Sequence, residues 1–158
     1  MKQPLALLFV SALCLFSYEG QAYTSTTNPA VETTPKSVSP NAAYTGTYLG
    51  TIPCTDCQGI TMELKLQENG RSKSKTFVLK QQYLGKPAKQ NTHVVTGKWF
   101  MATGNKQNPK AKVLQLIPDG KEDLIYFELL KDGSIKLLDN RQNQIKSKQN
   151  YTLKKQRA

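Results

Sequence analysis

The chain has 158 residues, of which 38% are hydrophobic and 21% charged, and its formal net charge at pH 7 is +11. The length allows one small folded domain, and no stretch of roughly twenty apolar residues predicts a membrane-spanning helix. Nucleic acid is a common partner of a basic chain, but the basic residues are scattered and lack the interleaved aromatic side chains of a single-strand-binding surface, so we expect none.

The first 22 residues have the pattern of an export signal. Lys2 supplies a positive start, residues 5–16 form an apolar run, and small residues lead up to Ala22. A signal peptidase needs small residues at its cleavage site, so we expect cleavage between Ala22 and Tyr23. The predicted location is the periplasm.

Cys14 lies inside this leader. A lipidation signal would place a small residue before the cysteine, whereas Leu13 stands there, so an outer-membrane lipoprotein is the less favoured alternative. Removal of the leader leaves Cys54 and Cys57, an even number suited to an oxidising compartment.

Residues 23–43 are mainly Thr, Ser, Pro, Asn and Ala, which predicts a disordered linker before a domain at 44–158. The net charge stays at +11 without the leader, because Lys2 and Glu19 cancel. We interpret most of these charges as solvated turns and a basic tail, with an anionic membrane or lipopolysaccharide surface as the alternative partner.

Short strands separated by turn formers fill the predicted domain. Apolar and polar residues alternate over 60–67, which predicts a strand with one buried face. The other predicted strands are residues 44–52, 76–84, 93–101, 112–117, 124–130, 135–138 and 151–153. The pattern predicts an all-β fold, in which about eight antiparallel strands form a meander that closes on itself.

Two closely spaced thiols precede the clearest strand. Cys54 and Cys57 have the spacing that a disulfide or one shared soft metal ion requires. A permanent clamp, a reversible redox pair and a copper site are the three interpretations. Asp56 lies between the two cysteines in the sequence, and its negative charge disfavours a strongly nucleophilic thiolate at either one.

Several motifs, in this order and spacing, resemble the N-terminal domain of the NlpE family of copper-resistance and envelope-stress lipoproteins. The motifs are Gly50-Thr51-Ile52-Pro53-Cys54-Thr55-Asp56-Cys57-Gln58-Gly59-Ile60, Leu64-Lys65-Leu66, Tyr83-Leu84-Gly85, Gly97-Lys98-Trp99, Leu137-Leu138-Asp139 and Asn150-Tyr151-Thr152-Leu153. The resemblance implies a lipocalin-like β-barrel in the bacterial envelope, copper homeostasis and signalling to a stress-sensor kinase. It carries over Cys54 and Cys57 as the metal or redox pair.

Copper(I) is the metal that two thiolates would favour, because both ion and ligand are soft. Met62, Met101 and His93 are candidate auxiliary ligands, although both methionines fall in strand patterns where core packing is the expected role. The aromatic residues Trp99 and Phe100 are likewise assigned mostly to the core.

No enzyme signature is present, since the chain lacks a nucleophile elbow, a zinc-binding helix motif and a phosphate-binding glycine loop. We therefore expect a non-enzymatic protein. The alternative to copper handling is a lipocalin-like carrier of a small apolar ligand or lipid, with a purely structural disulfide.

Overall fold

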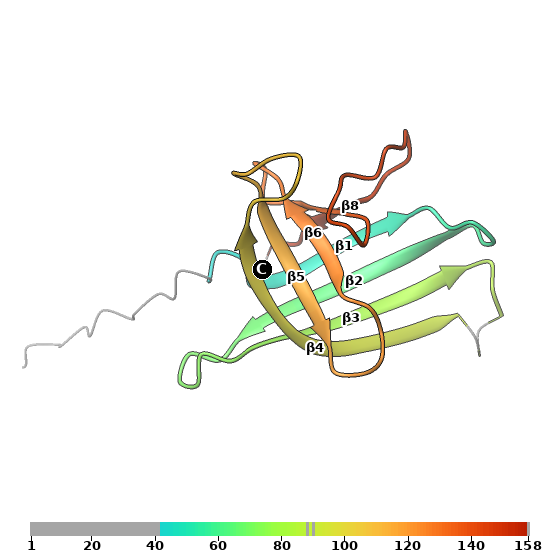
Figure 1. The fold of residues 1–158 in the computed structure, drawn as a ribbon. Coiled ribbons are helices and arrows are strands. Elements are labelled where there is room, and N and C mark those ends of the chain that lie inside the picture. The colour runs from blue at the N-terminus through green and yellow to red at the C-terminus, as the bar shows by residue number, and fades with distance from the viewer. Residues whose placement is uncertain (1–41, 88, 90, 158) are drawn as a thin grey trace, which may run out of the picture. The chain divides into compact units, whose positions relative to one another are not determined.

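The computed structural model describes residues 42–87, 89 and 91–157 (Figure 1). The predicted signal peptide and nearly all of the predicted linker therefore lie outside the described residues. Eight strands form a closed barrel in which each strand pairs antiparallel with the next and the last returns to the first. They are β1 Gly46–Ile52, β2 Gly59–Glu68, β3 Lys75–Leu84, β4 Thr92–Thr103, β5 Lys112–Pro118, β6 Ile125–Leu129, β7 Ile135–Leu137 and β8 Thr152–Lys155.

This architecture confirms the predicted fold class. Every predicted strand is present, because alternation of apolar and polar residues specifies a strand with one buried face. Leu64 and Leu66 of β2 are 0% and 2% exposed, whereas Lys65 between them points to solvent. The turn after β2 spans residues 69–74. Asn69 organises it by accepting hydrogen bonds on its side chain from the backbone N–H groups of Arg71 and Ser72.

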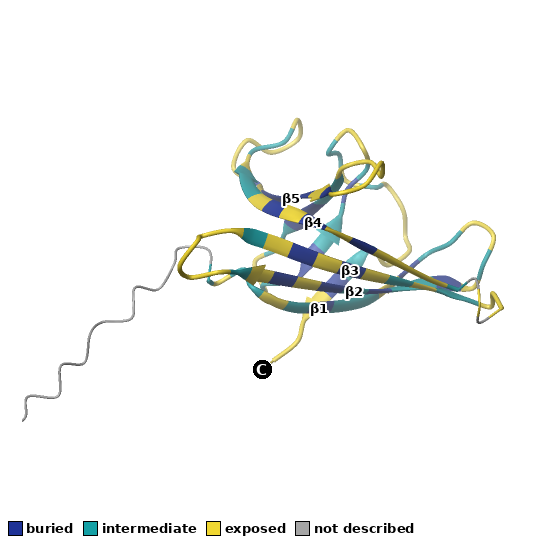
Figure 2. Cartoon of the chain, turned by 90° about the horizontal axis from the view of Figure 1, so that it is seen from below, coloured by how far each residue is buried: buried dark blue, intermediate teal, exposed yellow. Residues whose placement is uncertain are grey.

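Large apolar side chains fill the interior of the barrel. They come from all eight strands: Tyr48, Ile52, Met62, Leu64, Leu66, Phe77, Leu79, Val95, Trp99, Leu114, Leu116, Phe127, Ile135 and Leu153. Figure 2 shows the resulting alternation of buried and exposed residues along the strands. Trp99, 2% exposed, also donates a hydrogen bond from Nε1 to the backbone oxygen of Gln67, which satisfies its one polar group.

The expectation that Trp99 and Phe100 both belong to the core is wrong for Phe100. Successive side chains of a strand point to opposite faces, so the inward position of Trp99 sends Phe100 outward, where it is 39% exposed. A second, smaller apolar cluster lies on the outer face around Val113, Ala111 and Leu138. Among the described residues, no helix is long and apolar enough to cross a membrane.

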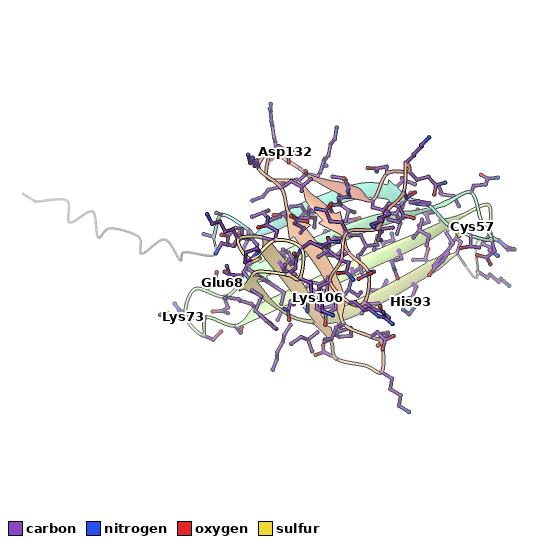
Figure 3. The ribbon with its side chains drawn as sticks, turned by 45° about the horizontal axis from the view of Figure 1, so that its top comes forward. Cys57, Glu68, Lys73, His93, Lys106 and Asp132 are labelled. Atoms are coloured by element: carbon purple, nitrogen blue, oxygen red, sulfur yellow. A yellow bond between two sulfur atoms is a disulfide. The ribbon has the colours of Figure 1, made fainter. Side chains whose placement is uncertain are left out.

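The meander places alternate connections at opposite ends of the barrel. We call one the cysteine end, formed by residues 52–59, 84–87, 89, 91–92, 118–125 and 137–152. The other is the entry end, formed by residues 42–46, 68–75, 103–112, 129–134 and 154–157, where the chain enters its first strand. In Figure 3, Lys73 marks the entry end, and Cys57 lies far from it on the opposite side.

Candidate functional site

The two predicted cysteines lie on the loop that joins β1 to β2. Cys54 and Cys57 form a disulfide with an S–S distance of 2.04 Å and a Cα–Cα distance of 5.3 Å. Both residues are half-buried. Gly59, at the start of β2, has a φ of 150°, a conformation that side chains disfavour, which explains a glycine where the loop returns to the sheet.

Contacts with the β3–β4 connection hold this loop. The backbone N–H of Gln58 donates to the carbonyl oxygen of Leu84 at 3.1 Å. Lys86 Nζ lies 3.0 Å from Asp56 Oδ2. The cysteine loop is thus tied to a segment about thirty residues further along the chain.

Asp56 stays charged at neutral pH. Lys86 donates a hydrogen bond to its carboxylate and adds a positive charge nearby, and together these hold the pKa of Asp56 below its ordinary value. The side chain of Asp56 is 78% exposed, so it meets solvent and solutes directly. A fixed negative charge therefore stands beside the two sulfurs.

Each sulfur lies close to an oxygen. Cys54 Sγ is 3.4 Å from Asp56 Oδ1, and Cys57 Sγ is 3.3 Å from the carbonyl oxygen of Gly59. A disulfide sulfur carries no hydrogen, so these are contacts rather than hydrogen bonds. After reduction the same oxygens would accept the two S–H groups, which favours the protonated thiols.

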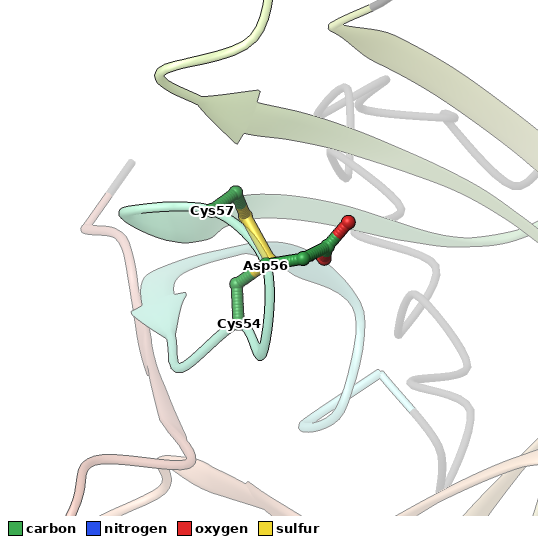
Figure 4. Close-up of side chains that lie close together, drawn as sticks. All are labelled: Cys54, Asp56 and Cys57. Carbon is green, nitrogen blue, oxygen red and sulfur yellow. A yellow bond between two sulfur atoms is a disulfide. The ribbon is translucent and has the colours of Figure 1, made fainter.

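The three side chains form the one group of His, Cys, Asp or Glu ligand atoms suited to a metal ion that we find in the described part of the chain. Their ligand atoms, two sulfurs and one carboxylate oxygen, lie within 4.8 Å of one another (Figure 4). The disulfide occupies both sulfurs, so soft-metal binding requires its reduction first. The donor set fits copper(I) in the reduced state and not in the oxidised one.

The predicted auxiliary ligands are not brought to this loop. Met62 is buried in the core at 2% exposed, and Met101 lies near the entry end, where it packs against the core. His93 is the second residue of β4, at the cysteine end, but its Nε2 faces Glu122 Oε1 at 3.8 Å, and it is not part of the metal-capable group.

Sequence reasoning missed two parts of the site. Asp56 was considered only as a charge that disfavours the thiolate, although its position between the cysteines signals a third ligand. Lys86 could not be predicted as part of the site, because no local sequence pattern links it to the Asp56 carboxylate in another loop. The alternative of an internal carrier gains no support, since Tyr48, Phe77 and Phe127, each at most 1% exposed, occupy the barrel interior.

Comparison with known proteins gives consistent matches. The family described as the NlpE N-terminal domain matches residues 48–148. Lipoprotein NlpE of Escherichia coli (strain K12) is 27% identical over 148 residues, which are 94% of this chain and 54% of that protein. The chain thus spans about half the length of this curated relative.

Two solved structures are also similar. The crystal structure of the Cpx pathway activator NlpE from Escherichia coli has a TM-score of 0.49 and 28% identity, covering 72% of this chain and 52% of that one. The crystal structure of a putative lipoprotein from Shewanella oneidensis has the same score and identity, covering 72% of this chain and 89% of the other.

Proposed function

Because the chain belongs to the NlpE N-terminal domain family, we propose that it is a non-enzymatic envelope protein that handles copper and reports envelope stress through Cys54 and Cys57. The observation that carries this proposal is the gathering of two sulfurs and the Asp56 carboxylate on one solvent-facing loop. The rest of the barrel holds that loop in place, so a change in the loop would be presented on a rigid support.

The disulfide makes the proposed site conditional on redox state. Reduction by a dithiol transfers two electrons and two protons to the bond between Cys54 and Cys57, and the dithiol leaves as its own disulfide. The two thiols then lose their protons as they bind copper(I), which prefers sulfur ligands. Asp56 offers a harder oxygen ligand, so its contribution to copper affinity is the smaller one.

The proposed partner is an envelope-stress sensor kinase. The Escherichia coli relative is described as a Cpx pathway activator, and we extend a corresponding role to this chain. Relatives are also described as lipoproteins, and we place this protein in the envelope, exported to the periplasm with cleavage after Ala22. Reduction of the disulfide and binding of copper(I) would change the loop at the cysteine end, and such a partner could recognise that change.

Competition against a chromogenic copper(I) chelator tests the copper site. The reduced protein should retain one copper(I), and the double variant Cys54→Ser, Cys57→Ser should retain none. Met101→Leu is the matched control, because it removes a sulfur at the other end of the barrel and should leave copper retention unchanged. Circular dichroism checks that each variant folds, and equal retention by wild type and double variant would refute the proposal.

Native mass spectrometry without reductant separates the remaining interpretations. The oxidised protein should carry no copper, and addition of a dithiol should restore binding and add two hydrogens to the copper-free species. A permanent clamp predicts that the double Ser variant still supports copper tolerance in cells wherever it folds. A redox sensor without copper predicts reversible reduction with no retained metal.

A further inference from the structure

The positive charge of this protein is concentrated at one end of the barrel. The segments of the entry end carry ten basic residues: Arg71, Lys73, Lys75, Lys106, Lys110, Lys112, Lys131, Lys154, Lys155 and Arg157. They carry two acidic residues, Glu68 and Asp132, so the formal charge of this end is +8. All ten basic residues except Lys75 are exposed.

The cysteine end is nearly neutral. Its segments carry six basic residues, Lys86, Lys89, Lys121, Arg141, Lys146 and Lys148, and five acidic ones, Asp56, Asp119, Glu122, Asp123 and Asp139. The formal charge there is +1, against +8 at the entry end. Because the two ends lie further apart than the screening length of about 8 Å at physiological salt, the molecule presents a strongly directional charge.

A shallow depression at the entry end concentrates part of this charge. Its volume is about 440 Å³, and Lys110, Lys112 and Lys131 line it with one acidic residue, Glu128. Glu128 is 8% exposed and accepts a hydrogen bond on Oε2 from Gln144 Nε2 at 2.9 Å. The lysines come from two different connections, which the pairing of β5 with β6 brings side by side.

We infer that the entry end is a docking surface for a bilayer of anionic phospholipid. A formal charge of +8 on one end, with nine of its ten cations exposed, is complementary to the phosphate groups of such a bilayer. Tyr44 is the one aromatic residue among the described residues of this end, and it is half-buried. The surface therefore lacks the exposed rings on which bases of single-stranded nucleic acid stack, and lipid phosphates are the better match.

This docking is electrostatic and peripheral. Each Lys or Arg near an anionic leaflet strengthens binding about fivefold, and the effect is lost within a screening length. No large apolar side chain at the entry end is among those the structure leaves exposed, so insertion into the hydrocarbon is not required. Binding should therefore depend steeply on salt and on the fraction of anionic lipid.

Co-sedimentation of the exported chain with vesicles tests the inference. Vesicles of phosphatidylcholine with phosphatidylglycerol are compared with vesicles of phosphatidylcholine alone. The entry variant replaces one cation in each of four segments: Arg71→Gln, Lys110→Gln, Lys131→Gln and Arg157→Gln. The matched control removes the same charge from the cysteine end: Lys121→Gln, Arg141→Gln, Lys146→Gln and Lys148→Gln.

We expect the wild type and the control variant to bind the anionic vesicles, with the control weakened far less than the entry variant. The entry variant should bind on the order of 10²–10³-fold more weakly than the wild type, and about 1 M salt should abolish binding by the wild type. Equal weakening of both variants, equal binding to neutral vesicles, or preferential binding of a single-stranded oligonucleotide would overturn the inference. The inference does not rest on the copper proposal, because the Cys54→Ser, Cys57→Ser variant should bind vesicles as the wild type does.

Discussion

Replacing Gly50 with alanine tests the seam at which the barrel closes. A Cβ atom on Gly50 would lie 2.5 Å from the carbonyl oxygen of Thr152 and 3.0 Å from Leu153 Cα. Both neighbours are backbone atoms of the strand that completes the barrel, so they cannot turn aside as a flexible side chain would. The two strands must separate, and only two Cα pairs, Tyr48 with Lys155 and Leu49 with Lys154, define their register.

Overpacking of this kind costs about 1–3 kcal/mol of folding free energy. For a domain of this size, each kcal/mol lowers the melting temperature by about 4 °C, so we expect a fall of about 4–12 °C. Urea denaturation followed by circular dichroism, with the disulfide intact, measures the free energy of unfolding. If the slope of the unfolding free energy against urea concentration is unchanged, the substitution has altered stability and not the surface exposed on unfolding.

Gly70→Ala is the matched control. A Cβ at Gly70 would meet nothing within 4 Å, and its backbone lies outside the positive-φ region, so alanine fits without strain. It should raise the free energy of unfolding by about 0.4–1 kcal/mol, because alanine restricts the unfolded chain. If Gly50→Ala were as stable as the wild type, the close approach of β1 and β8 would be wrong.

Three further predictions concern the core, the site and the processed chain. Leu64→Asp should cost more than about 4 kcal/mol and unfold the domain, because Leu64 is 0% exposed. Lys65→Gln should change stability by less than about 0.5 kcal/mol, and the same denaturation assay distinguishes them. Asp56 pairs with Lys86, so its lowered pKa means that the stabilisation is complete above about pH 4 and is lost as pH falls through the folded pKa. NMR titration of the Asp56 carboxyl carbon should show its pKa return toward the ordinary value in Lys86→Gln, and an unchanged titration would contradict the pairing. N-terminal sequencing of the exported protein should begin at Tyr23, whereas a lipid-modified Cys14 would disprove that cleavage.

Local patterns in the sequence were enough to predict the strands. A period of two residues, as in β2, requires one face to be buried, and glycine or proline marks most of the breaks. The same locality made the Cys54–Cys57 pair visible, because three residues of separation bring their Cα atoms within disulfide range whatever the rest of the fold does. The two-residue period of a strand also predicts that Phe100 points outward, once its neighbour Trp99 is assigned to the core.

Contacts between distant segments were decided only by the pairing of the strands in the tertiary structure. Lys86 reaches Asp56 because β2 and β3 pair along ten residues, and no local pattern records that meeting. The sequence determines a net charge of +11, but its basic residues look scattered along the chain. The antiparallel pairing of consecutive strands places alternate connections at opposite ends, and the folded barrel gathers the scattered basic residues into one basic face around Lys110 and Lys131.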